Sequence, residues 1–407
     1  MEWKRIRLGD YISIKSGLAY SGSKIGKGES ILLGMGCVSF KDKFVESGAR
    51  PYDDICDDRF VVKPGDIVLA TRQQSDNLPI LAMPAIIPQS YQGKRVIFGT
   101  NLYKVENKSE ISNRFLFWLF KHQHYVNYIA GIKSGTAVQM VTKKNVEDYK
   151  FLCPPANVRY SISSILWTYD NLIENNTRRI RLLEQMAENL YKEWFVRFRF
   201  PGHEKAEFEN GLPKGWKEEI ASNVIDVMSG GTPKTEREDY YGGVIPFYTP
   251  KDAEDSIFVY STITNITEEG LAHCNSQYYP INTLMITARG TVGKLSLLAV
   301  PMAMNQSCFA LKFKDSKNPY YLYYSIKNEV AKLKKMANGG VFDTIIVKTF
   351  DHIKIIVPSD KILCAFDEQV TPILVQIQNL QRQSTLLSRQ RDLLLPRLMS
   401  GKLEVNV

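Results

Sequence analysis

The chain contains one pattern of residues twice, and this constrains its fold more than any other feature. Residues 134–154, SGTAVQMVTKKNVEDYKFLCP, align without gaps with residues 338–358, NGGVFDTIIVKTFDHIKIIVP, at an offset of 204 positions. Upstream, Trp3 matches Trp216 at an offset of 213, and GDIVLATR, which ends at Arg72, matches NTLMITAR, which ends at Arg289. The two ends of the pattern match clearly, while the offset changes between them. This indicates two copies of one domain whose interiors have diverged.

Each copy predicts the same order of elements. Apolar runs bounded by Gly and Pro predict short strands, and an aromatic-rich segment predicts a helix. A glycine-containing loop, a strand that ends at proline and a long helix follow. The strands are expected at 66–71 and 283–287, the aromatic helices at 115–129 and 320–335, and the prolines are Pro154 and Pro358.

Apolar residues alternate in steps of three and four along both long helices, which is the pattern of a coiled-coil seam. Helices of about 35–40 residues span about 50–60 Å. Packing lengthwise on their own domain is an alternative, but two matched seams in one chain favour packing against each other. The seam residues are Ile162, Ile165, Tyr169, Leu172, Ile180, Leu183 and Leu190 in the first helix, and Phe366, Val370, Ile373, Ile377, Leu380, Leu387 and Leu394 in the second.

The predicted fold class is therefore α+β, with two tandem mixed α/β domains separated by two long helices that pack as an antiparallel coiled coil. The domains are expected at 1–153 and 213–357, and the helical regions at 154–212 and 358–407. The chain carries 52 Lys and Arg against 43 Asp and Glu, a net charge of +9, and most of the excess lies in residues 1–153. This charge favours an anionic partner only weakly.

Several classes of protein are excluded by the sequence. No apolar run approaches the ~20 residues of a membrane helix, and the first residues lack the apolar core of a secretory signal. The 6 cysteines and 5 histidines show no metal-ligand spacing. Phosphate-loop, hydrolase, kinase and methyltransferase motifs are missing. We therefore expect a cytoplasmic protein with no membrane contact, no metal and no catalytic residue.

Loops at matched positions in the two copies carry side chains suited to DNA. Glycine permits close backbone approach, Ser and Thr can bond phosphate oxygens, and Arg and Gln can read base edges. Taken singly, each loop could be an ordinary solvated loop, but the recurrence favours a DNA-binding role. The candidates are Arg72, Gln73, Gln74, Lys133, Ser134, Gly135, Thr136, Gln139, Lys143 and Lys144 in the first copy, and Lys234, Thr235, Arg237, Arg289, Thr291, Lys294, Lys335, Asn338, Gly339, Gly340 and Lys348 in the second.

Three segments resemble a known family. LYKEWFVRFRFPGHE (190–204) is similar to the end of the central conserved helix of type I restriction–modification specificity subunits, GLPKGWK (211–217) to the start of their second target-recognition domain, and LLLPRLMSGKLEV (393–405) to their C-terminus. With the duplication and the twin helices, the resemblance covers essentially the whole chain.

The resemblance implies a non-catalytic subunit that reads a bipartite, asymmetric site in double-stranded DNA, one half with each domain. The helices would fix the separation of the half-sites and dock two modification (methyltransferase) subunits. Those partners would use S-adenosylmethionine for adenine-N6 methylation, and restriction/translocase subunits would add ATP- and Mg²⁺-dependent cleavage. No cofactor is expected on this chain itself.

Two other functions are compatible with parts of the pattern. A self-sufficient methyltransferase or nuclease with an unfamiliar site would transfer methyl groups, or cleave DNA, without partners. A coiled-coil scaffold with protein-binding domains would show no sequence-selective DNA binding.

Overall fold

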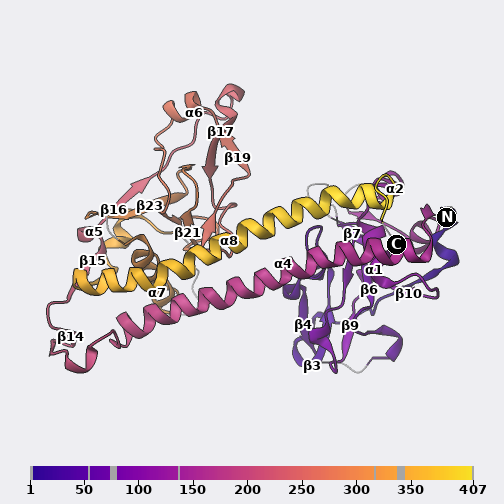
Figure 1. Cartoon of the computed structure of the whole chain (residues 1–407), viewed down its shortest axis with the longest axis horizontal. Helices are drawn as coiled ribbons and strands as arrows, with labels where there is room; N and C mark the ends of the chain where they lie inside the picture. Colours follow the sequence, from indigo (N-terminus) through magenta and orange to yellow (C-terminus); the bar gives the residue numbers. More distant parts are fainter. Residues whose placement is uncertain are drawn as a thin grey trace. The chain divides into compact units, whose positions relative to one another are not determined.

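Contacts divide the chain into two compact units. The first unit comprises Met1–Asn175 and Gln383–Val407, and the second comprises Asn176–Arg382. The computed structural model of the chain (Figure 1) describes residues 3–53, 56–73, 80–135, 138–315, 318–336 and 344–405, without the side chain of Met336.

The first unit contains two four-stranded sheets. One has the order β2-β10-β6-β8 and the other the order β4-β3-β9-β5, while β1 pairs with β12 and the short β7 pairs with β11. Their bounds are β1 Lys4–Arg7, β2 Ile12–Ser16, β3 Ile25–Leu33, β4 Ala49–Tyr52, β5 Val61–Val62, β6 Ile67–Ala70, β7 Arg72–Gln73, β8 Pro84–Ile86, β9 Val96–Phe98, β10 Leu102–Asn107, β11 Gln139–Met140 and β12 Lys150–Cys153.

The aromatic-rich segment of the first unit forms two helices, α1 (Asn113–Lys121) and α2 (Gln123–Ile132), where the sequence predicts one. Ser112 caps α1 by accepting a hydrogen bond from the backbone N–H of Phe115 at 3.2 Å. His122 has extended backbone angles, and this ends α1 and starts α2. All six side chains of FLFWLF in α1 are buried in the core of the unit.

The second unit repeats this arrangement with a larger sheet. β15 pairs with β24, as β1 pairs with β12, and a five-stranded sheet has the order β16-β23-β20-β21-β18 beside a three-stranded sheet, β19-β17-β22. The bounds are β15 Lys217–Ile220, β16 Ile225–Ser229, β17 Tyr241–Tyr248, β18 Phe258–Val259, β19 Thr264–Ile266, β20 Leu284–Thr287, β21 Leu295–Leu298, β22 Ala303–Met304, β23 Cys308–Phe313 and β24 Lys354–Val357, with helices α5 Ala221–Val224, α6 Glu268–Ala272 and α7 Pro319–Met336. A small hairpin, β13 Phe208–Glu209 with β14 Leu212–Pro213, precedes them.

Packing requires a glycine at one matched position in each copy. A Cβ atom at Gly17 would lie 2.1 Å from the carbonyl oxygen of Gly99, and one at Gly230 would lie 2.4 Å from that of Asn305. β2 ends against the backbone that precedes β10, and β16 ends against the backbone that precedes β23. Because the backbones lie so close, no side chain fits at either glycine. Gly230, the first residue of the Gly-rich segment at 230–237, is therefore explained by the fold of the unit.

The long helices are α4 (Ala156–Tyr191), which continues as a π-helical turn over Lys192–Val196, and α8 (Asp360–Met399). Each unit contains a part of both helices, and there they run side by side (Figure 1). In the first unit Ile162 and Leu166 share a core with Leu395 and Leu398, and Asp170 bonds Arg391, so the helices are antiparallel. In the second unit the ring of Trp194 packs 5.9 Å from that of Phe366.

Most predicted seam residues are buried or half-buried. Leu172 differs, because its side chain is 44% exposed and lines a groove of about 420 Å³ together with Tyr169 and Leu387. The buried members are Ile162, Phe366, Val370, Ile377 and Leu380, and the half-buried ones are Ile165, Tyr169, Ile180, Leu183, Leu190, Ile373, Leu387 and Leu394.

The helices pack against the domains as well as against each other. In the second unit Ala187 and Tyr191 share one core with Tyr321 and Tyr324 of α7 and with residues of the five-stranded sheet. The compact units therefore divide each helix, whereas the sequence predicts separate helical regions. Among the described residues, no helix is long and apolar enough to cross a membrane.

Candidate nucleic-acid interface

In the first unit two distant candidate segments meet. β7 follows β6 directly and pairs with β11 in the register Arg72↔Met140 and Gln73↔Gln139. Thr71, just before β7, donates its N–H to Asn101 O at 3.0 Å and accepts from Val141 N at 3.2 Å. The chain is therefore held on both sides at Thr71, and the side chain of Arg72 is exposed immediately after it.

The loop before β11 is closed by its own backbone. Ser134 and Met140 exchange two backbone hydrogen bonds, of 3.2 and 2.8 Å. Gly135 has φ = +98°, and a Cβ atom there would lie 2.2 Å from the carbonyl oxygen of Val138. Only glycine fits this turn, so Gly135 shapes the loop that brings Ser134 beside Met140.

Gln73 is placed differently from the other candidates because its side chain is only 4% exposed. Its amide nitrogen donates to Gln139 Oε1 at 2.7 Å, and its amide oxygen accepts from Leu81 N at 3.0 Å. Gln73 therefore links three segments inside the protein, and the half-buried Gln139 is the member of the pair nearer the surface.

Lys143 and Lys144 start α3 (Lys143–Glu147), next to this loop. Thr142 and Asn145 form a capping box that fixes the start of the helix. Both lysine side chains are exposed, and no ion pair involves either of them among the residues that the structure describes. Such lysines suit phosphate contacts, which carry affinity without sequence preference. Lys133, at the other end of the loop, is half-buried.

The second unit repeats the backbone arrangement. Ala288 donates its N–H to Ser307 O at 2.8 Å and accepts from Ile345 N at 3.0 Å, as Thr71 does with Asn101 and Val141. Arg289 follows at once and its side chain is exposed. Arg72 and Arg289, which the repeat aligns, thus each follow a residue held by the same two backbone hydrogen bonds.

The turn after Arg289 is organised around buried Thr287. Thr287 Oγ1 accepts from Lys294 N at 3.0 Å, and its carbonyl oxygen accepts from Gly293 N at 2.8 Å. The ammonium group of Lys294 is 2.9 Å from Asp255 and 3.2 Å from Ala253 O. Lys294 is thus paired with a carboxylate in this structure, and DNA would have to compete for it. Thr291 is exposed and donates to Pro250 O at 3.3 Å.

The basic segment at 234–237 is also charge-paired. Arg237 donates two hydrogen bonds to Asp239, of 2.8 and 2.7 Å, and its guanidinium lies 4.8 Å from the ring centre of Tyr240. The Asp239 carboxylate raises the pKa of Arg237. Lys234 and Thr235 are exposed, as are Lys335 at the end of α7 and Lys348 in the 3-10 turn Val347–Asp351.

Five of the candidates lie outside the described residues: Gln74, Thr136, Asn338, Gly339 and Gly340. Met140 is not singled out by the sequence pattern, although it lies opposite Arg72 and is 42% exposed. A strand of two residues has no periodicity that could have revealed this.

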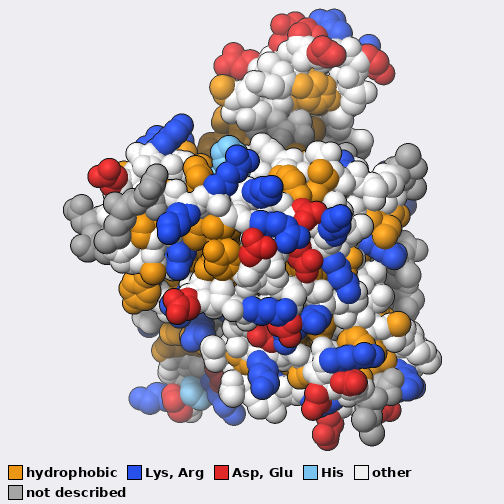
Figure 2. Space-filling model, turned by 90° about the vertical axis from the view of Figure 1, so that its right-hand side faces the viewer, with side chains coloured by type: hydrophobic (Ala, Val, Ile, Leu, Met, Phe, Trp, Pro, Cys, Tyr) orange, Lys and Arg blue, Asp and Glu red, His pale blue; other side chains and the backbone are white. Residues whose placement is uncertain are grey.

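One face of the molecule is mixed in charge. Figure 2 shows Lys and Arg side chains spread over one face with Asp, Glu and hydrophobic side chains between them. Within the described ranges, no group of three or more His, Cys, Asp or Glu residues is arranged to hold a metal ion.

A family model and curated proteins match the chain. The model of the type I restriction modification DNA specificity domain matches twice, at residues 1–185 and 213–388. The specificity subunit of the type I restriction enzyme HindI of Haemophilus influenzae is 25% identical over 374 residues, covering 75% of this chain and 81% of that protein. The MjaIX specificity subunit of Methanocaldococcus jannaschii is 25% identical over 307 residues, covering 73% of this chain and 71% of that protein.

One solved structure also resembles the fold. The crystal structure of the type I restriction–modification S subunit from M. genitalium superposes with a TM-score of 0.57 at 15% identity, covering 100% of this chain and 97% of that one. The likeness concerns the fold alone at this identity.

Proposed function

Because the chain belongs to the family of type I restriction–modification DNA specificity subunits, which are non-catalytic, we propose that it reads a bipartite, asymmetric site in double-stranded DNA, one half with each unit. The observation that carries the proposal is the repeated backbone arrangement that exposes Arg72 in one unit and Arg289 in the other. An arginine can donate two hydrogen bonds to O6 and N7 of guanine in the major groove. The surrounding side chains differ between the units, so the two halves would differ in sequence.

The long helices would set the gap between the two half-sites, because α4 and α8 each contribute to both units. Half-sites read from one side of the duplex lie about one turn, roughly 34 Å, apart. Continuous helices suit such a separation because their length is fixed at 1.5 Å per residue.

The helices would also dock two modification subunits. Leu182 on α4 is 54% exposed and Leu386 on α8 is 59% exposed. The offset of 204 makes these two leucines equivalent. The equivalence of these two leucines under the repeat supports two similar docking surfaces, one for each partner. The modification subunits would use S-adenosylmethionine to methylate adenine N6, and restriction/translocase subunits would use ATP and Mg²⁺.

The reading function is tested by co-expressing the chain with a cognate modification subunit and mapping methylated adenines across a genome. A split motif with a fixed gap is expected. Arg72→Ala should relax one half of the motif and Arg289→Ala the other, each by ~1–3 kcal/mol at one or two base pairs. Val244→Ala is the control, since Val244 is 84% exposed in the second unit and not part of either loop.

An undivided motif would contradict the proposal. Absence of methylation, with intact assembly, would instead favour a scaffold whose domains bind proteins.

Docking is tested by measuring the mass of the assembled complex. Leu182→Asp and Leu386→Asp should each remove one of two modification subunits, because a buried carboxylate without a partner is costly. Val244→Asp should leave the stoichiometry unchanged. Two modification subunits bound to both leucine variants would refute these docking surfaces.

A further inference from the structure

Three exposed side chains form a row across the first unit's candidate interface. Met140 pairs with Arg72 on one side and exchanges backbone hydrogen bonds with Ser134 on the other. Residues directly opposite each other in antiparallel pairing present their side chains on the same face. Arg72, Met140 and Ser134 therefore lie side by side on one face, and all three are exposed.

The neighbours of Met140 show why its side chain points outward. Val141 is 2% exposed, and Gln139 is tied to buried Gln73. Side chains alternate between the two faces of a strand, so the face opposite that of Gln139 and Val141 is the solvent side. The pairing of its strand thus leaves Met140 42% exposed, although its thioether side chain is largely apolar.

The size of the row matches a short run of base pairs. Side chains on adjacent paired strands are about 5 Å apart, so three of them span about 10 Å. Successive base pairs are 3.4 Å apart. The row could therefore contact about three base pairs, with a guanidinium, an apolar group and a hydroxyl in that order.

We propose that Met140 is a base-contacting residue of the first unit, held between Arg72 and Ser134, and that it packs against the C5 methyl group of a thymine. Thymine is the base whose major-groove edge carries a methyl group, and apolar side chains recognise it by contact. This inference rests on the proposed function and adds a specificity-determining residue to it.

The second unit supports a role in specificity for this position. Ile345 donates its N–H to Ala288 O, as Val141 donates its N–H to Thr71 O, so Thr344 corresponds to Met140 by its position in the chain. The arginine is retained as Arg289, while the residue that corresponds to Met140 changes from a thioether to a hydroxyl. Two units that keep the arginine and differ beside it would read different bases next to a common contact.

The test uses the full chain assembled with its modification subunits and synthetic duplexes that carry the mapped motif. The half-site of the first unit is the one that Arg72→Ala relaxes. Each thymine in that half is replaced in turn by uracil, which removes only the methyl group. We expect one position at which uracil lowers the affinity about fourfold, the factor that corresponds to burying one methyl group.

Met140→Ala should lower the affinity for the thymine duplex by a similar factor and abolish its sensitivity to uracil at that position. Val244→Ala should retain that sensitivity. A half-site without thymine, or uracil sensitivity that persists in Met140→Ala, would overturn the inference while leaving the proposed function intact. A wild-type complex without a split motif would instead remove the proposed function.

Discussion

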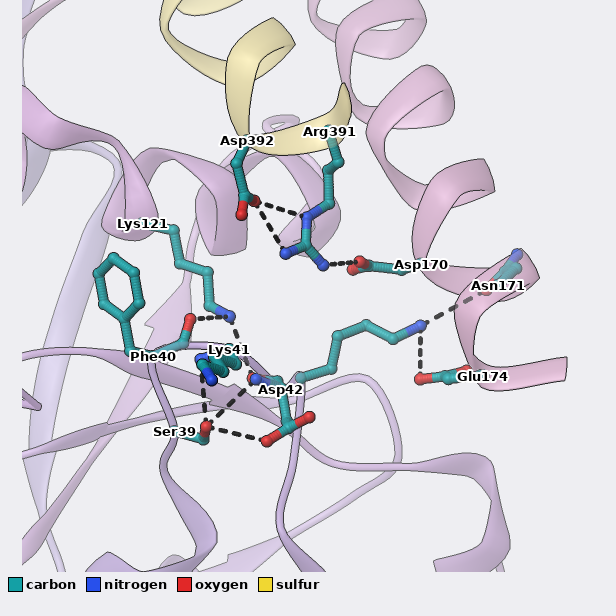
Figure 3. A network of polar contacts seen from close by, with 11 residues as sticks. Ser39, Phe40, Lys41, Asp42, Lys121, Asp170, Asn171, Glu174, Arg391 and Asp392 are labelled. Atoms are coloured by element: carbon teal, nitrogen blue, oxygen red, sulfur yellow. Dashed lines mark hydrogen bonds and ion pairs between the residues drawn. The ribbon is translucent and has the colours of Figure 1, made fainter. Parts of the chain in front are cut away.

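A buried ion pair joins the long helices in the first unit, and its removal has a calculable effect. Arg391 Nη1 on α8 donates to Asp170 Oδ1 on α4 at 2.6 Å, and the residues are 8% and 3% exposed (Figure 3). The other oxygen of Asp170 is buried without a hydrogen-bond partner among the described residues. Burial raises the pKa of Asp170 even though the Arg391 charge lowers it. Desolvation is thus the larger effect on this carboxylate.

The second unit provides the apolar version of the same contact. The offset of 204 makes Asp170 equivalent to Leu374 and Arg391 equivalent to Ala187, which are 1% and 0% exposed. Arg391→Ala alone leaves a buried carboxylate without its partner and should destabilise the first unit by ~3–5 kcal/mol. Asp170→Leu with Arg391→Ala removes both charges, so at least ~2 kcal/mol of that loss should be recovered.

The assay is urea unfolding followed by hydrogen exchange of peptides from 160–175 and 385–399. Peptides from 366–380, in the second unit, serve as the internal reference. A double variant as unstable as Arg391→Ala would refute the reasoning, because the cost would then come from lost packing and not from an unpaired charge.

Three further predictions follow from other contacts. Gln73→Ala should relax the first half-site as Gln139→Ala does, and the double change should add little, because Gln73 acts by positioning Gln139. Lys144→Glu should weaken DNA binding similarly for all sequences and reduce the salt dependence of log K by about one phosphate contact. Burial lowers the pKa of His122 to about 4, and the charge of His124 is a second, smaller cause. In the unfolded chain this histidine takes up its proton near pH 6.5. About 3 kcal/mol of the free energy of unfolding should therefore be lost as the pH falls from 6.5 to 4. His122→Asn should remove this pH dependence of stability.

Each of these has a contrary outcome. Additive effects of the two glutamine changes, measured by methylation mapping, would mean that Gln73 acts independently. A sequence-dependent loss in Lys144→Glu would assign that lysine to base reading. An unchanged acid-unfolding slope in His122→Asn, followed by circular dichroism, would place the proton uptake elsewhere.

The limits of the sequence prediction are visible in single residues. The seam was predicted from spacing, and Phe366, Val370 and Ile377 are buried as expected. Leu172 fits the same spacing and is 44% exposed, because burial depends on the partner helix as well as on period. The prediction of a single helix at 115–129 is wrong, because the chain breaks at His122. No glycine or proline marks this break, so the sequence gives no signal for it.

The sequence alone determined the duplication, the two long helices and the family, because each is visible in short local patterns of residues or in the repetition of such a pattern further along the chain. Only the tertiary structure decided which loop residues face outward. Gln73 and Met140 are 67 positions apart, and pairing of two-residue strands buries one and exposes the other. Such pairing depends on contacts between distant segments, and no local periodicity in the chain encodes it.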